Sequence, residues 1–156
     1  MKSNTATVLR GLLGAAALVC AVLGCSAEPE PTAWSTAEVL VEGSSFPGIH
    51  GLPFDEDDRL FAGSVVGQAI YRVDPYSGAV ETVEAPPLGM ADDLEFAADG
   101  TLVWTSFLLG KAHARSPGGE IEELASGLPG ANSLAFRDDG RLFMTQVFAG
   151  DALWEL

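Results

Sequence analysis

The sequence repeats one fifteen-residue phrase three times, and this repetition is its strongest constraint on the fold. The copies read IHGLPFDEDDRLFAG from residue 49, ADDLEFAADGTLVWT from residue 91 and ANSLAFRDDGRLFMT from residue 131. Aligned without gaps, they place Phe54, Phe96 and Phe136 in one column, with separations of 42 and 40 residues. A repeat of roughly 40 residues is typical of propeller blades, solenoids and helical arrays.

The content of each copy favours strands over helices. Each copy is a short alternating apolar run, then a turn such as Asp99-Gly100 or Asp139-Gly140, then a run of β-branched and aromatic residues. This order is typical of a β-hairpin. No stretch long enough for a globular helix shows the apolar period of a helix. We therefore predict an all-β chain.

The repeat unit extends beyond the phrase to four strands. We expect strands at 49–54, 59–65, 69–73 and 79–84, then at 91–96, 101–107, 111–115 and 120–125, and finally at 131–136, 141–148 and 152–156. Residues 38–42 match residues 121–125 and are expected to be the outer strand of a further unit. Four antiparallel strands in about 40 residues form the blade of a β-propeller.

Residues 38–156 are therefore predicted to be a propeller-type array of about three four-stranded blades. Propellers close with about four to eight blades, so three blades form only part of a ring. Two explanations stay open: a C-terminal half is missing from this sequence, or two copies assemble as a homodimer. Unpaired strand edges at both ends of the array favour either outcome over a stable monomer.

The N-terminus has the order of a secretory signal. Lys2 and Arg10 flank a basic start, residues 11–23 are uncharged and largely apolar, and Gly24-Cys25 follows. This segment resembles a bacterial lipoprotein signal, which implies cleavage after residue 24 and lipidation of Cys25. Plain secretion and an uncleaved anchor are the alternatives. Residues 25–37, rich in Glu, Pro, Ser and Thr, are expected to be a linker.

The expected location is thus the bacterial cell envelope, with the protein exported and held at its periplasmic or extracellular face by lipid alone. The whole chain has a net charge of −14. Loss of the signal would leave 6 basic residues against 22 acidic ones, a charge of −16. A strongly acidic surface repels nucleic acid and anionic lipid. We expect a small-molecule substrate or ligand and no nucleic-acid partner.

The stretches GMADDLEFAADGTLVWTS and PGANSLAFRDDGRLFMTQV carry a family resemblance. They resemble the SMP-30/gluconolactonase/LRE-like family of six-bladed β-propellers, and the resemblance covers residues 46–156. NHL-repeat proteins, strictosidine-synthase-like proteins and the virginiamycin B lyase-like group share much of the pattern. The resemblance implies a partial six-bladed propeller.

The resemblance also implies a metal-dependent lactone or ester hydrolase. In the family's enzymes one divalent cation, often calcium, lies at the channel mouth, held by a Glu and by Asn and Asp side chains at the start of inner strands. The cation polarises the lactone carbonyl while an acidic residue serves as base. By position Asp92 and Asn132 match the polar residue of that motif, and Asp92 is the expected base.

The first copy departs from the family pattern, since His50 stands where the family has a carboxylate. Calcium prefers oxygen ligands, whereas imidazole suits zinc and other transition metals. His50, Asp92 and Asn132 nevertheless occupy one column of the repeat, so we predict a metal site formed by these three residues. The alternatives are a structural role for His50 and Asx turns at Asp92 and Asn132. A non-catalytic cell-surface binding propeller, NHL-like, and a virginiamycin B lyase-like protein are the alternative functions.

Three further expectations concern residues near this column. Asp93 should point away from Asp92, because neighbouring side chains of a strand alternate. The cluster 55–58 should be a solvated turn. Four aromatic residues at strand spacing are expected to pack between blades: Trp104, Phe107, Phe143 and Phe148.

Overall fold

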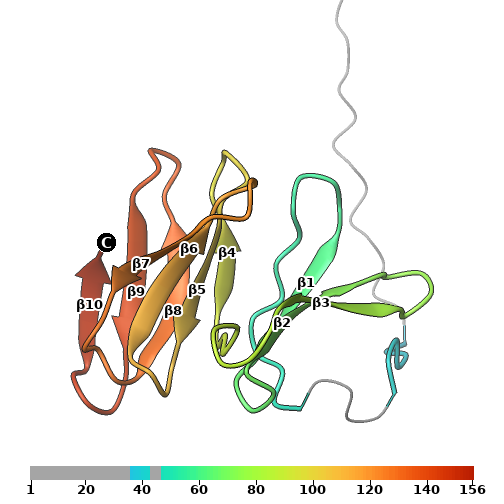
Figure 1. Cartoon of the computed structure of the whole chain (residues 1–156), viewed down its shortest axis with the longest axis horizontal. Helices are drawn as coiled ribbons and strands as arrows, with labels where there is room; N and C mark the ends of the chain where they lie inside the picture. The colour runs from blue at the N-terminus through green and yellow to red at the C-terminus, as the bar shows by residue number, and fades with distance from the viewer. Residues whose placement is uncertain (1–35, 43–46) are drawn as a thin grey trace, which may run out of the picture. The chain divides into compact units, whose positions relative to one another are not determined.

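The computed structural model describes residues 36–42 and 47–156, and within them the chain forms ten strands in three antiparallel sheets (Figure 1). Residues 38–156 form one structural unit. The predicted signal at 1–24, Cys25 and most of the linker lie outside the described residues. The described part contains no helix long and apolar enough to cross a membrane.

Each sheet corresponds to one repeat unit, and we call the sheets the first, second and third blade. The first blade has the order β1-β2-β3, the second β4-β5-β6-β7 and the third β10-β9-β8. The strands are β1 Leu60–Ser64, β2 Ala69–Val73, β3 Val80–Glu84, β4 Leu94–Phe96, β5 Leu102–Ser106, β6 Lys111–Arg115, β7 Ile121–Ala125, β8 Ala131–Phe136, β9 Leu142–Gln146 and β10 Ala152–Glu155. The predicted all-β array of about three blades is confirmed.

The predicted hairpin turns close the inner strands. Between β4 and β5, the Ala97 N–H donates to the Thr101 carbonyl at 2.9 Å and the Gly100 N–H to the Ala97 carbonyl at 2.9 Å. Between β8 and β9, the Arg137 and Gly140 N–H groups make the equivalent bonds at 2.9 and 2.8 Å. The same turn chemistry in two copies of the phrase therefore gives the same local structure.

The core lies between blades, and β5 supplies side chains to both sides of its sheet. Leu102 and Trp104 pack with Phe61 and Ile70 of the first blade. Val103, the residue between them, belongs to the second cluster, which includes Met144 of the third blade. Alternation along one buried strand thus builds both inter-blade interfaces.

The inner segment of the first blade is not the continuous strand predicted at 49–54. Only two isolated bridges remain, Ile49 to Ser64 and Phe54 to Leu60. Pro53 has no N–H to donate to a ladder, although its carbonyl accepts the Phe61 N–H at 2.9 Å. The segment therefore follows β1 without regular pairing.

The outer strand predicted at 38–42 is wrong. These residues form no strand, and Val39 is 73% exposed. An outer strand forms only where it pairs with the edge of a neighbouring strand. Among the described residues the third blade has three strands and ends at β10, and residues 38–42 do not add a fourth strand to it. The match to residues 121–125 reflects composition, whereas strand formation depends on a pairing partner.

Candidate functional site

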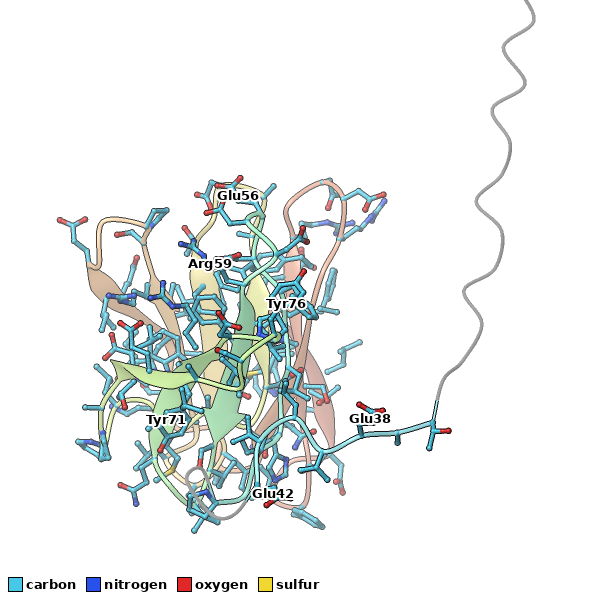
Figure 2. The ribbon with its side chains drawn as sticks, turned by 90° about the vertical axis from the view of Figure 1, so that its right-hand side faces the viewer. Glu38, Glu42, Glu56, Arg59, Tyr71 and Tyr76 are labelled. Atoms are coloured by element: carbon cyan, nitrogen blue, oxygen red, sulfur yellow. The ribbon has the colours of Figure 1, made fainter. Side chains whose placement is uncertain are left out.

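Antiparallel blades place their connections at two opposite edges. We call one the mouth edge: it carries the starts of the three repeat phrases and the loops 65–68, 107–110 and 147–151. The other, the turn edge, carries the turns 55–59, 97–101 and 137–141. Glu56 and Arg59 lie at the upper end of the first blade in Figure 2, which marks the turn edge. All three residues of the predicted metal site lie at the mouth edge.

The structure brings His50, Asp92 and Asn132 together, although they come from three different blades. Nδ1 of His50 lies 3.2 Å from Oδ1 of Asp92. Nδ2 of Asn132 donates to Oδ2 of Asp92 at 2.6 Å. Asp92 is thus the centre of the trio, with one carboxylate oxygen facing each neighbouring blade.

Backbone bonds fix the position of Asp92. Its N–H donates to the Thr105 carbonyl at 2.9 Å, and its carbonyl accepts the Gly51 N–H at 2.8 Å. The Thr105 hydroxyl donates to the Asn132 carbonyl at 2.6 Å. Threonine in the second strand of the phrase therefore ties the start of one blade to the start of the next.

Burial changes the acidity of Asp92, which is 7% exposed. Loss of solvation raises the pKa of its carboxyl above the ordinary value; nearby His50 opposes this shift and the adjacent Asp93 adds to it. A carboxylate with a raised pKa holds a proton more readily than a surface aspartate. His50 is the exposed member of the trio, with 54% of its side chain accessible.

Asp93 points away from the trio, as expected. Its Oδ1 accepts the N–H of Leu94 at 3.0 Å, and its Oδ2 accepts the N–H of Leu134 at 2.8 Å. The adjacent carboxylates therefore differ in their partners: Asp93 accepts backbone N–H groups in two blades, whereas Asp92 contacts the side chains of His50 and Asn132. The side chain of Asn132 likewise bonds to other side chains. The Asx-turn alternative does not describe Asp92 or Asn132.

An open hollow with a volume of about 560 Å³ lies over the trio. The rest of its lining is mainly apolar: Val65, Phe107, Leu108, Val147 and Phe148, with Asp151. Polar groups therefore meet solvent-accessible space at the base of an apolar rim, an arrangement typical of small-molecule sites.

The trio offers a partial donor set for a divalent cation. Asp92 supplies carboxylate oxygens and His50 an imidazole nitrogen, while Asn132 presents its Nδ2 to Asp92 and would offer Oδ1 after an amide flip. Among the described residues no group of three His, Cys, Asp or Glu side chains could hold a metal ion. As it lies in the structure, the trio presents carboxylate and imidazole donors, and Asn132 would complete a set of three ligands only after the amide flip.

Other polar groups lie away from this hollow. His113 is buried and stacks on Trp104 with ring centroids 5.2 Å apart, and burial lowers the pKa of its imidazole. A second hollow, of about 500 Å³, lies between the first and second blades at the turn edge. Three arginines line it, and each is ion-paired with a carboxylate. Neither feature was predicted from the sequence.

The expectation that Phe148 packs between blades is wrong, because this side chain is 86% exposed at the mouth edge. Trp104 is fully buried between the first and second blades, as expected. Phe107 is half-buried and meets Phe148 edge-on, with ring centroids 6.2 Å apart. Strand spacing alone does not distinguish an aromatic residue within a strand, such as Trp104, from those in the loops that follow the strands, Phe107 and Phe148.

Comparisons with known proteins identify the fold. No family model matches the sequence. No curated protein matches it either. Solved structures do match. A streptogramin B lyase matches with a TM-score of 0.59 at 20% identity, over 76% of this chain and 43% of the lyase. Virginiamycin B lyase from Staphylococcus aureus matches with a TM-score of 0.55 at 15% identity, over 69% of this chain and 40% of the lyase.

A protein assigned as a gluconolactonase matches with a TM-score of 0.56 at 16% identity, over 69% of this chain and 48% of that protein. This chain thus spans less than half the length of each of these three structures. At such low identity the likeness extends to the fold and no further. The chain has the fold of three blades of a β-propeller.

Proposed function

We propose that this chain is one arc of a propeller hydrolase that opens lactones or related esters at the mouth edge. One observation carries the proposal: a buried carboxylate, Asp92, lies between His50 and Asn132 at the base of an open hollow. Buried ionisable groups that meet accessible space are the usual components of catalytic sites. The sequence resemblance to gluconolactonases supports the same chemistry.

His50, Asp92 and Asn132 are the residues that would hold a divalent cation. When bound, the cation would polarise the carbonyl of the ester. Calcium follows from the family resemblance, whereas zinc or another transition metal suits the imidazole of His50.

Asp92 is the proposed base. Its carboxyl has a raised pKa, so it accepts a proton from attacking water more readily than an exposed aspartate. Nδ1 of His50 lies 3.2 Å from Oδ1 of Asp92 and would stabilise the ionised carboxylate before the proton transfer. Asn132 donates to Oδ2 and fixes the orientation of the carboxylate. Further ligands and substrate contacts would come from blades beyond this arc, so we expect weak turnover from these residues alone.

Cation binding tests the proposal without requiring a complete ring. Calorimetric titration of the chain with Ca²⁺ and with Zn²⁺ should detect one site, and Asp92→Ala should weaken binding at least tenfold. Asn132→Ala should weaken it less. Asp99→Ala, at the turn edge, is the matched control and should leave it unchanged. Equal affinity in the parent and Asp92→Ala would contradict the proposed metal site.

Isotope labelling distinguishes hydrolysis from a lyase reaction. A hydrolase working on a lactone in H₂¹⁸O places ¹⁸O in the product, whereas a lyase opens the ring without water. We expect label in the product and loss of turnover in Asp92→Ala.

A non-catalytic binding propeller is the second candidate. Its support is the hydrogen bond from Nδ2 of Asn132, which satisfies one oxygen of Asp92 within the protein. Absence of metal binding and of turnover, together with saturable ligand binding at the mouth edge, would favour this function. For either function we propose the cell envelope as the location, with Cys25 as the lipid anchor, from the order of the N-terminal sequence.

A further inference from the structure

Each of the three loops at the mouth edge begins with two apolar residues. These pairs are Val65-Val66 after β1, Phe107-Leu108 after β5 and Val147-Phe148 after β9. Turns normally carry polar residues and glycine at such positions. A recurrence in all three blades therefore needs an explanation beyond the local turn.

The second residue of each pair is exposed while the first is half-buried. Val66 is 68% exposed, Leu108 65% and Phe148 86%. We call these three side chains the apolar tips. Single exposed apolar residues are ordinary, but apolar side chains gathered around one hollow are typical of binding surfaces.

Two of the tips, Leu108 and Phe148, are continuous with the polar trio, whereas Val66 is not part of the same lining. The hollow that exposes His50, Asp92 and Asn132 is lined by Leu108 and Phe148 and by the half-buried partners of the tips. Its volume of about 560 Å³ suits a small molecule. A ligand that places a polar group at Asp92 therefore has apolar loop side chains beside it for the rest of its body.

Phe148 adds an independent observation. Its backbone has a φ of 63°, in the left-handed region that bulky residues rarely adopt. Glycine would adopt this conformation without cost, yet the position holds a phenylalanine with an exposed ring that meets Phe107 edge-on. Strain retained at an exposed aromatic residue is typical of a binding site.

We propose that two of the apolar tips, Leu108 and Phe148, determine specificity and that they select ligands with an alkyl or aromatic body attached to the polar group bound at the trio. This inference rests on the proposed function for the identity of the polar group. The contact with the body depends only on the tips and can be tested without catalysis.

The test measures the binding of neutral alcohols of increasing length, 1-butanol, 1-hexanol and 1-octanol, to the full chain by saturation-transfer NMR. Burial of each methylene in the hollow should raise affinity roughly two- to fourfold. Leu108→Ser and Phe148→Ser should flatten this dependence. Both side chains are largely exposed, so the melting temperature should stay unchanged. Leu153→Ser, which removes an exposed apolar side chain from β10, is the matched control and should bind like the parent.

Affinity that does not change with chain length, or changes equally in the parent and in both tip variants, would overturn the inference. Chain-length dependence that the tip variants lose would support it even if lactone turnover and cation binding are absent, in which case only the proposed hydrolase fails. Neutral phosphatidylcholine vesicles provide a further arm. Tip-dependent sedimentation with vesicles, without chain-length dependence for the alcohols, would assign the tips to a lipid surface and overturn the small-molecule inference.

Discussion

The two edges of the blades are built from connections of similar length but opposite chemistry. At the turn edge, aspartates satisfy local backbone: Asp74 accepts the N–H groups of Tyr76 and Ser77, and Asp99 accepts that of Thr101. At the mouth edge, Asp92 bonds to side chains of the two adjacent blades, beneath exposed apolar residues. Local turn stability therefore explains the aspartates of the turn edge, but it does not explain Asp92 at the mouth edge.

The contrast also extends to acidity. Backbone N–H donors lower the pKa of Asp74 and Asp99, because they stabilise the ionised carboxyl. Burial raises the pKa of Asp92. The turn edge thus favours the ionised form of its aspartates, and the mouth edge disfavours the ionised form of Asp92. This direction is expected where a functional site lowers the stability of the fold.

Two glycines with nearly equal backbone angles give the largest expected difference between the edges. Gly130 at the mouth edge has φ +85°, and a Cβ there would lie 2.0 Å from the Val147 carbonyl oxygen. Gly140 at the turn edge has φ +86° and open space around it. Gly130→Ala should lower the free energy of unfolding by roughly 4 kcal/mol and Gly140→Ala by about 1 kcal/mol. Urea denaturation measures both, and equal losses would show that the close approach at the mouth edge is not rigid.

A smaller difference is expected between the adjacent carboxylates Asp93 and Asp92. Asp93→Ala leaves the N–H groups of Leu94 and Leu134 without their partner, so it should cost about 3 kcal/mol of unfolding free energy. Asp92→Ala should cost much less unfolding free energy and should instead weaken cation binding at least tenfold. Thermal denaturation and calorimetry on the two variants separate the effects. A structural role for both would appear as similar destabilisation with cation binding retained in both.

The smallest expected effect is in the pH dependence of stability. Because the pKa of folded Asp92 is raised, its contribution is present below the ordinary value of 3.8 and is lost as pH rises through the folded pKa. Asp92→Asn should therefore be more stable than the parent at pH 7, by roughly 1 kcal/mol, and equal to it at low pH.

Asp99 should show the opposite sign. Its folded pKa is lowered, so its contribution is present above 3.8 and is lost as pH falls through the folded pKa. Denaturation of the parent, Asp92→Asn and Asp99→Asn between pH 2 and 8 gives the comparison. If the unfolding free energies of both variants deviate from that of the parent in the same direction as pH changes, the proposed difference in acidity between Asp92 and Asp99 is wrong.

Much of the fold was predictable because turn chemistry and alternation act over short distances. The predicted strands 69–73, 111–115 and 131–136 match β2, β6 and β8 residue for residue. The predictions that failed depend on distant partners. Residues 38–42 have strand composition but form no strand, although β10 ends the third blade as an edge strand. The inner segment of the first blade contains Pro53, which interrupts its ladder.

The candidate site was predictable only as a column of residues. Equivalent positions in successive blades must lie near one another, so the repeat predicted that His50, Asp92 and Asn132 meet. Their distances, the burial of Asp92 and the direction of each side chain depend on packing between blades. The apolar tips carry a sequence signal, since the pairs recur at a fixed place after each phrase, but aromatic spacing alone predicts that Phe148 packs between blades.

Thr105 has a consequence for how such an array could arise. Its hydroxyl accepts the N–H of Asp93 within its own blade and donates to the carbonyl of Asn132 in the next. Thr145 accepts the N–H of Ser133 in the same way. Thr105 of the second copy thus connects that copy to the third, and Thr145 holds the equivalent position in the third copy, whereas the first copy has Gly63 there. Tandem duplication of one coding unit would lengthen the array without the need to evolve a new interface at each junction.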